Sequence, residues 1–241
     1  MRRVGAPMTY RLILNADDFG YDPAVSRGIA ESMRQGVVSS TTMIVNSPWS
    51  EDAAAQADGL AVGLHLNLVR FQSVSQPSRE LTERAVFEMP FVVREIRAQL
   101  ERFRELLKRE PTHIDVHKHA HRESTVLNAL GIVARECKLA VRSIDEEMRQ
   151  ALRAAGVHTN DAFLGDAGDA AYWTPEVWAE KLDLAPREGV VEFMSHPGHR
   201  PSHVSSGYGP QREVELATFL SPAAREALVS RGLTLSSWAG V

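Results

Sequence analysis

The sequence predicts an α/β protein built around a parallel sheet. Short apolar runs that end in polar residues recur along the chain, and segments with helical spacing of apolar residues separate them. This alternation is typical of parallel strands joined by crossover helices. A chain of 241 residues can bury one large core, so residues 1–241 are expected to form a single domain, either a barrel or an open sheet.

The first elements follow from local patterns. A strand is expected at 10–15, because its apolar run stops at a polar cluster as a buried parallel strand does. A helix should begin at Pro23, since Asp22 can cap it, and end near Gly36. Two more strands are expected, at 40–45, which is rich in β-branched residues, and at 60–66.

A long loop is expected at 69–89, because Ser, Gln and Pro dominate its first half. An amphipathic helix follows at 91–109, where apolar residues recur every three or four positions until Pro111. The remaining expected elements are strands at 112–116, 139–142, 190–194 and 233–237, and helices at 126–137, 146–155, 175–184 and 222–231.

Composition excludes several classes of protein. A net charge of −4 and a pI near 6.1 give no electrostatic reason to bind nucleic acid or an anionic membrane. The single cysteine, Cys137, cannot form an internal disulfide. No apolar run reaches the roughly 18 residues that cross a bilayer, and no signal-type apolar segment follows Arg2 and Arg3. We therefore expect a cytoplasmic protein with no nucleic-acid partner and no membrane span.

Polar side chains collect where the predicted strands end. The carboxyl ends of parallel strands meet at one edge of an α/β sheet, so these side chains are expected to share a pocket. They are Asp17 and Asp18 after the first strand, His65 in the third, Asp115, His117, His119 and His121 around the fourth, and His196 and His199 after a later one.

This set of residues favours a metal site. Adjacent carboxylates at Asp17 and Asp18 repel each other unless a shared cation or proton relieves the charge. Two imidazoles and one carboxylate leave positions open for a divalent ion to activate water, and Asp18, His65 and His117 fit this description. Asp17 would then deprotonate the water and His196 would protonate a leaving group.

Structural roles are the alternative for each residue. Two aspartates before a helix are often a turn and cap, and a lone histidine in an apolar strand is often a hydrogen-bonded core residue. Alternation along an extended segment would put His117, His119 and His121 on one side, and it leaves open which of them binds metal. His158 and His203 are expected at the surface.

Five motifs occur in order along nearly the whole chain: LNADDFG at 14–20, STTMIVN at 40–46, GLHLN at 63–67, PTHIDVH at 111–117 and HPG at 196–198. Together they resemble the YdjC-like carbohydrate deacetylases, which include the chitooligosaccharide deacetylases. The segments QREVEL at 211–216, LSP at 220–222 and RGL at 231–233 extend the resemblance into the tail.

The resemblance implies a distorted (β/α) TIM-like barrel of the glycoside hydrolase and deacetylase type, and removal of acetyl groups from N-acetylated amino sugars. It implies Asp18, His65 and His117 as metal ligands, Asp17 as general base and His196 as general acid. Family resemblance implies Mg²⁺, whereas two nitrogen ligands favour Zn²⁺ or another transition ion, and both stay open. A homodimer is expected only by analogy with relatives.

Other residues are given supporting roles. Asp115 and His119 are expected to support the metal ligands by orienting an imidazole. Trp173, Trp178 and Tyr208 are candidates to stack on sugar rings, with core packing as the alternative, and Arg212 is a candidate substrate contact.

Two segments depart from the family pattern and bear on the substrate: the polar run 121–123 and the loop 68–77. A lipid-linked amino sugar as substrate, a phosphoester hydrolase and a non-catalytic sugar-binding protein remain as alternatives.

Overall fold

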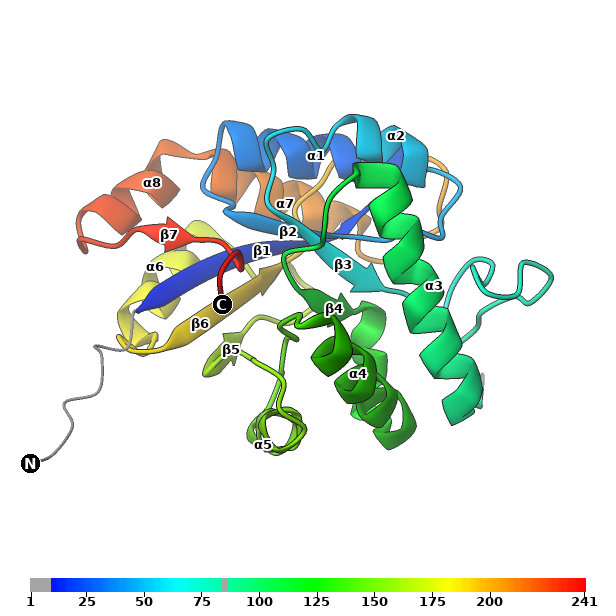
Figure 1. The fold of residues 1–241 in the computed structure, drawn as a ribbon. Coiled ribbons are helices and arrows are strands. Elements are labelled where there is room, and N and C mark those ends of the chain that lie inside the picture. The colour runs from blue at the N-terminus through cyan, green and yellow to red at the C-terminus, as the bar shows by residue number, and fades with distance from the viewer. Residues whose placement is uncertain (1–9, 84–85) are drawn as a thin grey trace, which may run out of the picture.

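The computed structural model describes residues 10–83 and 86–241. Its sheet is parallel throughout, with strand order β4-β3-β2-β1-β6-β5, and β7 also pairs with β1 (Figure 1). The strands are β1 (Arg11–Phe19), β2 (Ser40–Met43), β3 (Val62–Leu66), β4 (Ile114–Val116), β5 (Ala162–Leu164), β6 (Val190–Ser195) and β7 (Leu235–Ser236).

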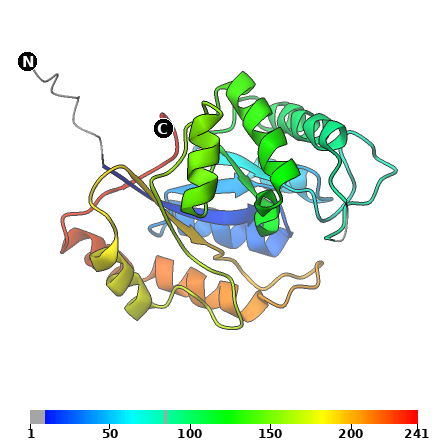
Figure 2. The ribbon, with the colours of Figure 1, turned by 90° about the horizontal axis from the view of Figure 1, so that it is seen from below.

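The helices lie outside the sheet, which curls into a half-barrel (Figures 1 and 2). Segments far apart in the sequence pack together there: α1 lies beside α7, and α3 beside α4 (Figure 2). The helices are α1 (Pro23–Arg34), α2 (Ser50–Ala55), α3 (Met89–Leu107), the 3-10 helix η1 (His117–Arg122), α4 (Ser124–Cys137), α5 (Glu146–Ala154), α6 (Pro175–Leu184), α7 (Gly209–Leu220) and α8 (Pro222–Val229). The prediction of a distorted (β/α) barrel is confirmed.

An irregular segment connects α4 to α5. The strand predicted at 139–142 is wrong, since only an isolated bridge between Val141 and Ile114 forms. The amide of Ile114 donates to Ala140 O, and that of Val141 donates to His158 O, both at 2.9 Å. The chain then turns into α5, whose first turn Asp145 caps at Met148 N, so the segment is too short for a ladder.

The histidine-rich segment is not extended, so the predicted alternation of its side chains is wrong. Residues 117–122 form η1, in which Lys118 and His119 have left-handed φ values of 53° and 49°. The backbone therefore turns sharply after His117, and the alternation expected of an extended strand does not determine where the three imidazoles point.

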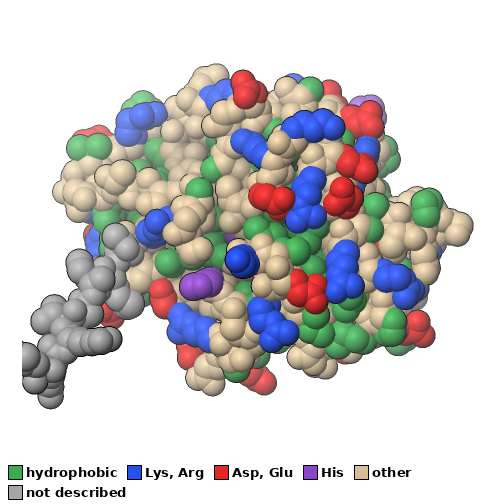
Figure 3. Space-filling model, in the orientation of Figure 1, with side chains coloured by type: hydrophobic (Ala, Val, Ile, Leu, Met, Phe, Trp, Pro, Cys, Tyr) green, Lys and Arg blue, Asp and Glu red, His purple; other side chains and the backbone are tan. Residues whose placement is uncertain are grey.

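Apolar side chains fill the core, and charged side chains lie mostly on the surface. Trp173, Trp178, Phe193 and Phe219 form a fully buried aromatic cluster between β6 and the helices α6 and α7. Acidic and basic side chains are interspersed over the face drawn in Figure 3. Within residues 10–83 and 86–241, no helix is long and apolar enough to cross a membrane.

Candidate metal centre and active site

A cavity of about 510 Å³ opens at the carboxyl ends of β1, β3, β4 and β6. The structure brings most of the residues predicted to share a pocket to this cavity, but Asp115 and His121 are buried away from its lining, and His199 is half-exposed beside Glu31. The predicted residues that line it are Asp17, Asp18, His65, His117, His119, His196, Tyr208 and Arg212.

Three side chains at the base of this cavity face one another. Asp18 Oδ1 lies 3.3 Å from His65 Nε2 and 3.0 Å from His117 Nδ1, and the two nitrogens are 3.1 Å apart. Ligands about 2.1 Å from one ion lie roughly 3.0 Å apart at right angles and roughly 3.4 Å apart in a tetrahedron. Among the described residues Asp18 Oδ1 has no hydrogen-bond donor although it is buried, a need that a cation would meet. The donor set therefore fits a divalent metal ion.

The end of β1 has the backbone geometry that this cluster requires. Successive side chains of a strand point to opposite faces, yet Asp17 and Asp18 both line the cavity. A left-handed φ of 73° at Asp18 makes this possible, and a non-glycine residue adopts it only where its surroundings enforce it. At Gly20, with φ 88°, an added Cβ would lie 2.6 Å from Ile44 O, so the chain just after β2 passes too closely for any side chain.

His65 is oriented from behind by Asp115. Its Nδ1 lies 2.7 Å from Asp115 Oδ1, which directs Nε2 toward Asp18 and His117, and this is the contact expected of Asp115. Burial lowers the pKa of His65, but the surrounding carboxylates, chiefly Asp115, outweigh it and raise the pKa to about 10. Thr42 Oγ1 donates to Asp115 Oδ2 at 2.9 Å and completes the support.

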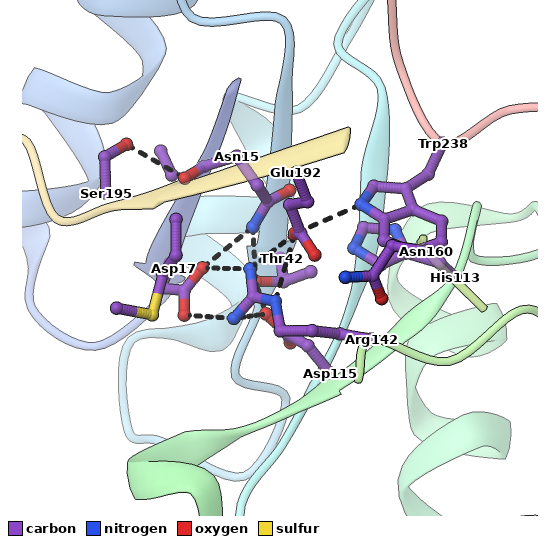
Figure 4. A network of polar contacts seen from close by, with 12 residues as sticks. Asn15, Asp17, Thr42, His113, Asp115, Arg142, Asn160, Glu192, Ser195 and Trp238 are labelled. Carbon is purple, nitrogen blue, oxygen red and sulfur yellow. Dashed lines mark hydrogen bonds and ion pairs between the residues drawn. The ribbon is translucent and has the colours of Figure 1, made fainter. Parts of the chain in front are cut away.

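Arg142 is the centre of the buried polar network in Figure 4. Its guanidinium, which is fully buried, donates to both oxygens of Asp17 at 2.6 and 2.7 Å. It also bonds Asp115 Oδ2 at 2.8 Å and Glu192 Oε1 at 2.7 Å. Burial acts to raise the pKa of Asp17, but Arg142 outweighs it, so the pKa lies below its usual range and Asp17 is ionised.

The same network bears on metal placement. Asp17, His65 and Asp115 form a second group whose possible ligand atoms lie within 4.8 Å of one another. The Arg142 guanidinium already bonds the carboxylates of Asp17 and Asp115, so it supplies the positive charge that a metal ion would supply to this second group. Sequence reasoning did not identify Arg142; the one signal was a charged residue at the end of an apolar run.

His196 lies across the cavity in contact with residues of α7. Its backbone N–H donates to Glu215 Oε2 at 2.6 Å, and Tyr208 Oη donates to Glu215 Oε1 at 2.7 Å. The Tyr208 and His196 rings meet edge to face with centroids 5.5 Å apart. Burial lowers the pKa of His196 to about 4 despite the opposing effect of Asp17 and Asp18. The sequence analysis also missed Glu215.

Arg212 lies between Tyr208 and Glu215 on the inner face of α7. Its Nη2 donates to Asp18 Oδ2, so this buried arginine fixes the carboxylate of the ligand cluster. Its Nη1 and Nε have no partner among the described residues, and the side chain also lines the cavity, where a substrate contact was expected.

Two other expectations are corrected by burial and contacts. Trp173 and Trp178 have no exposed surface, and Trp173 Nε1 donates to Met194 O at 2.6 Å, so neither indole can stack on a sugar. His119 lines the cavity and packs edge-on against Phe163, 5.8 Å between centroids. In the described parts of the chain it makes no hydrogen bond to Asp18, His65 or His117, so it does not orient them.

The structure is a parallel half-barrel with an Asp-His-His cluster, able to hold a metal ion, at the carboxyl ends of its strands. The chain matches the YdjC-like protein family over residues 11–230 and belongs to that family. It is 31% identical to a chitooligosaccharide deacetylase of Enterobacter sp. (strain 638), covering 94% of this chain and 97% of that one. It is 32% identical to a chitooligosaccharide deacetylase of Proteus mirabilis (strain HI4320), covering 96% and 98%.

Solved structures share the fold. A candidate cellobiose-phosphate cleavage protein of Enterococcus faecalis V583 superposes with a TM-score of 0.81 at 29% identity, covering 95% of this chain and 98% of that one. A peptidoglycan N-acetylglucosamine deacetylase superposes with a TM-score of 0.56 at 12% identity, covering 95% and 88%, which is a likeness of fold alone.

Proposed function

We propose that the protein is a metal-dependent carbohydrate deacetylase, a single catalytic domain that removes acetyl groups from N-acetylated amino sugars of the chitooligosaccharide type. One observation carries this proposal: the Asp18, His65 and His117 cluster lies beside the ionised Asp17 in a cavity of about 510 Å³. Relatives of nearly the same length at 31–32% identity are named chitooligosaccharide deacetylases, which supports this substrate class for the proposal.

Asp18, His65 and His117 would hold the ion and leave coordination positions open. A divalent ion bound there supplies Lewis acidity, which polarises an acetyl carbonyl and lowers the pKa of water from about 15.7 toward 7. Two imidazole nitrogens with one carboxylate suit Zn²⁺ or a similar transition ion better than Mg²⁺, which prefers oxygen ligands.

Asp17 serves as the proton acceptor in this proposal. It lines the cavity next to Asp18, and its low pKa keeps it ionised over the whole neutral range. The paired bonds from Arg142 and the 2.8 Å bond from Asn15 Nδ2 fix the carboxylate in one orientation. A fixed, ionised carboxylate accepts a proton from water without first losing one of its own.

His196 serves as the proton donor to the departing amine. With a pKa of about 4 the imidazole is neutral in the resting site, so it must gain a proton during the reaction before it can give one up. The proton that Asp17 removes from water is the nearest source. Glu215 and Tyr208 keep the imidazole in place through the backbone bond and the ring contact.

The test is acetate release from N-acetylglucosamine oligomers by the metal-loaded protein. We expect wild type to release acetate and Asp17→Asn to lose about 10²- to 10⁴-fold in kcat, since one positioned proton-transfer group contributes that much. Asp58→Asn, on an exposed turn, is the matched control. Equal rates in wild type and Asp17→Asn would remove Asp17 from the reaction, and no acetate release by either protein from any N-acetylated amino sugar would overturn the reaction class.

A further inference from the structure

His119 lines the active-site cavity but takes no part in the metal cluster or in the proton transfers assigned to Asp17 and His196. It lies in η1, where Lys118 and His119 have left-handed φ values of 53° and 49°. Two consecutive non-glycine residues in this conformation are uncommon, and such backbone strain clusters at ligand-binding and catalytic sites. The strained turn brings a second imidazole of the histidine-rich segment to the cavity wall.

Packing holds the imidazole of His119 in place. Its ring meets Phe163 of β5 edge to face with centroids 5.8 Å apart, and it lies 5.9 Å from the ring of His121, which is fully buried. The guanidinium carbon of Arg142, which bonds Asp17, lies 5.6 Å from the centroid of the same Phe163 ring. Phe163 therefore contacts both His119 and the arginine that fixes the proton acceptor.

One nitrogen of this imidazole is available to a bound molecule. Nδ1 is enclosed and has no hydrogen-bond partner among the described residues, whereas Nε2 is not enclosed and makes no hydrogen bond with them either. Because His119 lines the cavity, Nε2 is the ring nitrogen that can reach a ligand. An enclosed N–H without an acceptor is costly, so we assign the proton to Nε2 and leave Nδ1 with its lone pair.

The other nitrogen donors on the cavity wall already have partners or roles. Lys118 Nζ pairs with Glu83, and Arg70 Nη1 donates to Tyr21 Oη at 2.6 Å. Within the described parts of the chain, the nitrogen-bearing side chains that line the cavity besides His119 are His65, Arg70, His117, Lys118, His196 and Arg212. His119 Nε2 is therefore the nitrogen donor that remains for the substrate.

We propose that His119 is a further catalytic residue, whose Nε2–H donates a hydrogen bond to the carbonyl oxygen of the acyl group that is removed. This rests on the proposed function and deepens it. When the water oxygen bonds the carbonyl carbon, the water proton passes to Asp17 and the π electron pair of the C=O bond moves onto the acyl oxygen. A donor that is already in place at this oxygen stabilises the developing charge without reorganisation.

The first measurement is turnover of the N-acetylglucosamine dimer and of its N-trifluoroacetyl analogue. His119→Phe keeps a ring against Phe163 but removes the N–H, so kcat for the acetyl substrate should fall about 10²- to 10³-fold with KM little changed. The loss should be about tenfold smaller for the trifluoroacetyl analogue, because the fluorine atoms already stabilise the charge on the oxygen.

Two further variants accompany His119→Phe. His119→Gln occupies the same strained position and keeps an N–H at the end of its side chain, so it should recover most of the lost kcat. His158→Phe, at an exposed histidine that does not line the cavity, is the matched control and should leave both rates unchanged.

The second measurement is independent of turnover. It uses the metal-loaded protein with an analogue of the dimer in which CH₂ replaces each amide N–H, so that the acyl carbonyl is kept as a ketone that cannot be hydrolysed. A hydrogen bond to a carbonyl oxygen lowers its infrared stretching frequency. The ketone band of the bound analogue should therefore lie at a lower frequency in wild type and His119→Gln than in His119→Phe.

The outcomes separate the two proposals. The same ketone band in wild type and His119→Phe would overturn the contact with His119 while leaving the deacetylase. Equal losses of kcat for the acetyl and trifluoroacetyl substrates would also overturn it. A band displacement that depends on His119, without acetate release from any N-acetylated amino sugar by wild type, would support the contact and overturn the deacetylase.

Discussion

Replacement of Arg142 tests whether this buried arginine keeps Asp17 ionised and fixed in orientation. The guanidinium is fully buried and bonds three carboxylates that are at most 2% exposed, those of Asp17, Asp115 and Glu192. Removing one partner of a buried ion pair costs about 3–5 kcal/mol, a large part of the roughly 5–15 kcal/mol that stabilises a domain. We therefore expect Arg142→Met to be barely folded and Arg142→Lys to be the variant that can be assayed.

In Arg142→Lys the charge remains but the planar fork is lost. The lysine side chain is shorter, and its ammonium group cannot bond the carboxylates of Asp17, Asp115 and Glu192 at once. Each lost hydrogen bond to a charged group costs about 1–3 kcal/mol. The effect of burial on Asp17 is then less well opposed, so the pKa of Asp17 rises from its present low position. In wild type, stability from this carboxylate is present above its unfolded pKa and lost as pH falls through the lowered folded pKa. In the variant the folded pKa lies closer to the unfolded one, so the loss is smaller and is complete at a higher pH.

Urea unfolding at several pH values and the pH profile of kcat/KM measure these effects. We expect a lower urea midpoint and an acid limb displaced to higher pH in Arg142→Lys. Arg149→Lys, at a buried arginine that bonds Asn160 O and Glu146, is the matched control and should leave the acid limb in place. An acid limb that stays at the wild-type pH in Arg142→Lys would refute the role assigned to Arg142.

Three other predictions follow from contacts around the site. Burial raises the pKa of Glu215 to about 7, so ionisation of this carboxyl lowers the free energy of unfolding of wild type as pH rises from about 4.5 to 7. Glu215→Gln has no such ionisation, so in urea unfolding its free energy of unfolding should rise by about 3 kcal/mol relative to wild type over that pH window. Trp238→Phe keeps a ring stacked on His113 but removes the 3.2 Å bond to Glu192, and calorimetry should show a loss of about 1 kcal/mol. Chelation of the divalent ion should lower Tm by roughly 5–10 °C, since a ligand at 100 times its Kd stabilises by about 2.7 kcal/mol, and an unchanged Tm would argue against a bound ion.

Elements with local signals could be predicted from the sequence. Asp22 and Pro23 specify the start of α1, and Asp22 Oδ1 accepts from Ala24 N at 2.8 Å. The helix predicted at 175–184 has the same bounds in the structure, with Thr174 as its cap. In such cases a few neighbouring residues decide the structure.

The sequence analysis missed α7, because its buried face mixes the charged Arg212 and Glu215 with the apolar Leu216 and Phe219. Arg212 and Glu215 point inward to Asp18 and His196, so the helix lacks the apolar periodicity by which buried faces are recognised. The short elements α2 and β5 were also missed. The strand predicted at 10–15 proved to be longer, and β1 includes both aspartates.

Site residues could be predicted where topology decides their position. The ends of parallel strands converge, which brings Asp18, His65 and His117 together across the sequence. The roles of Arg142 and Trp173 depend on which way a side chain faces and on partners far away in the chain. Arg142 bonds Asp17 across 125 positions, a relation that no local pattern contains.

The metal content of the protein after dialysis tests the central claim most directly. Mass-spectrometric metal analysis should find one divalent ion per chain in wild type and in His199→Ala, whose imidazole is half-exposed and faces Glu31. It should find almost none in His65→Ala. Retention of one ion per chain by His65→Ala, or the absence of any ion from wild type supplied with Zn²⁺ or Mg²⁺, would contradict the account.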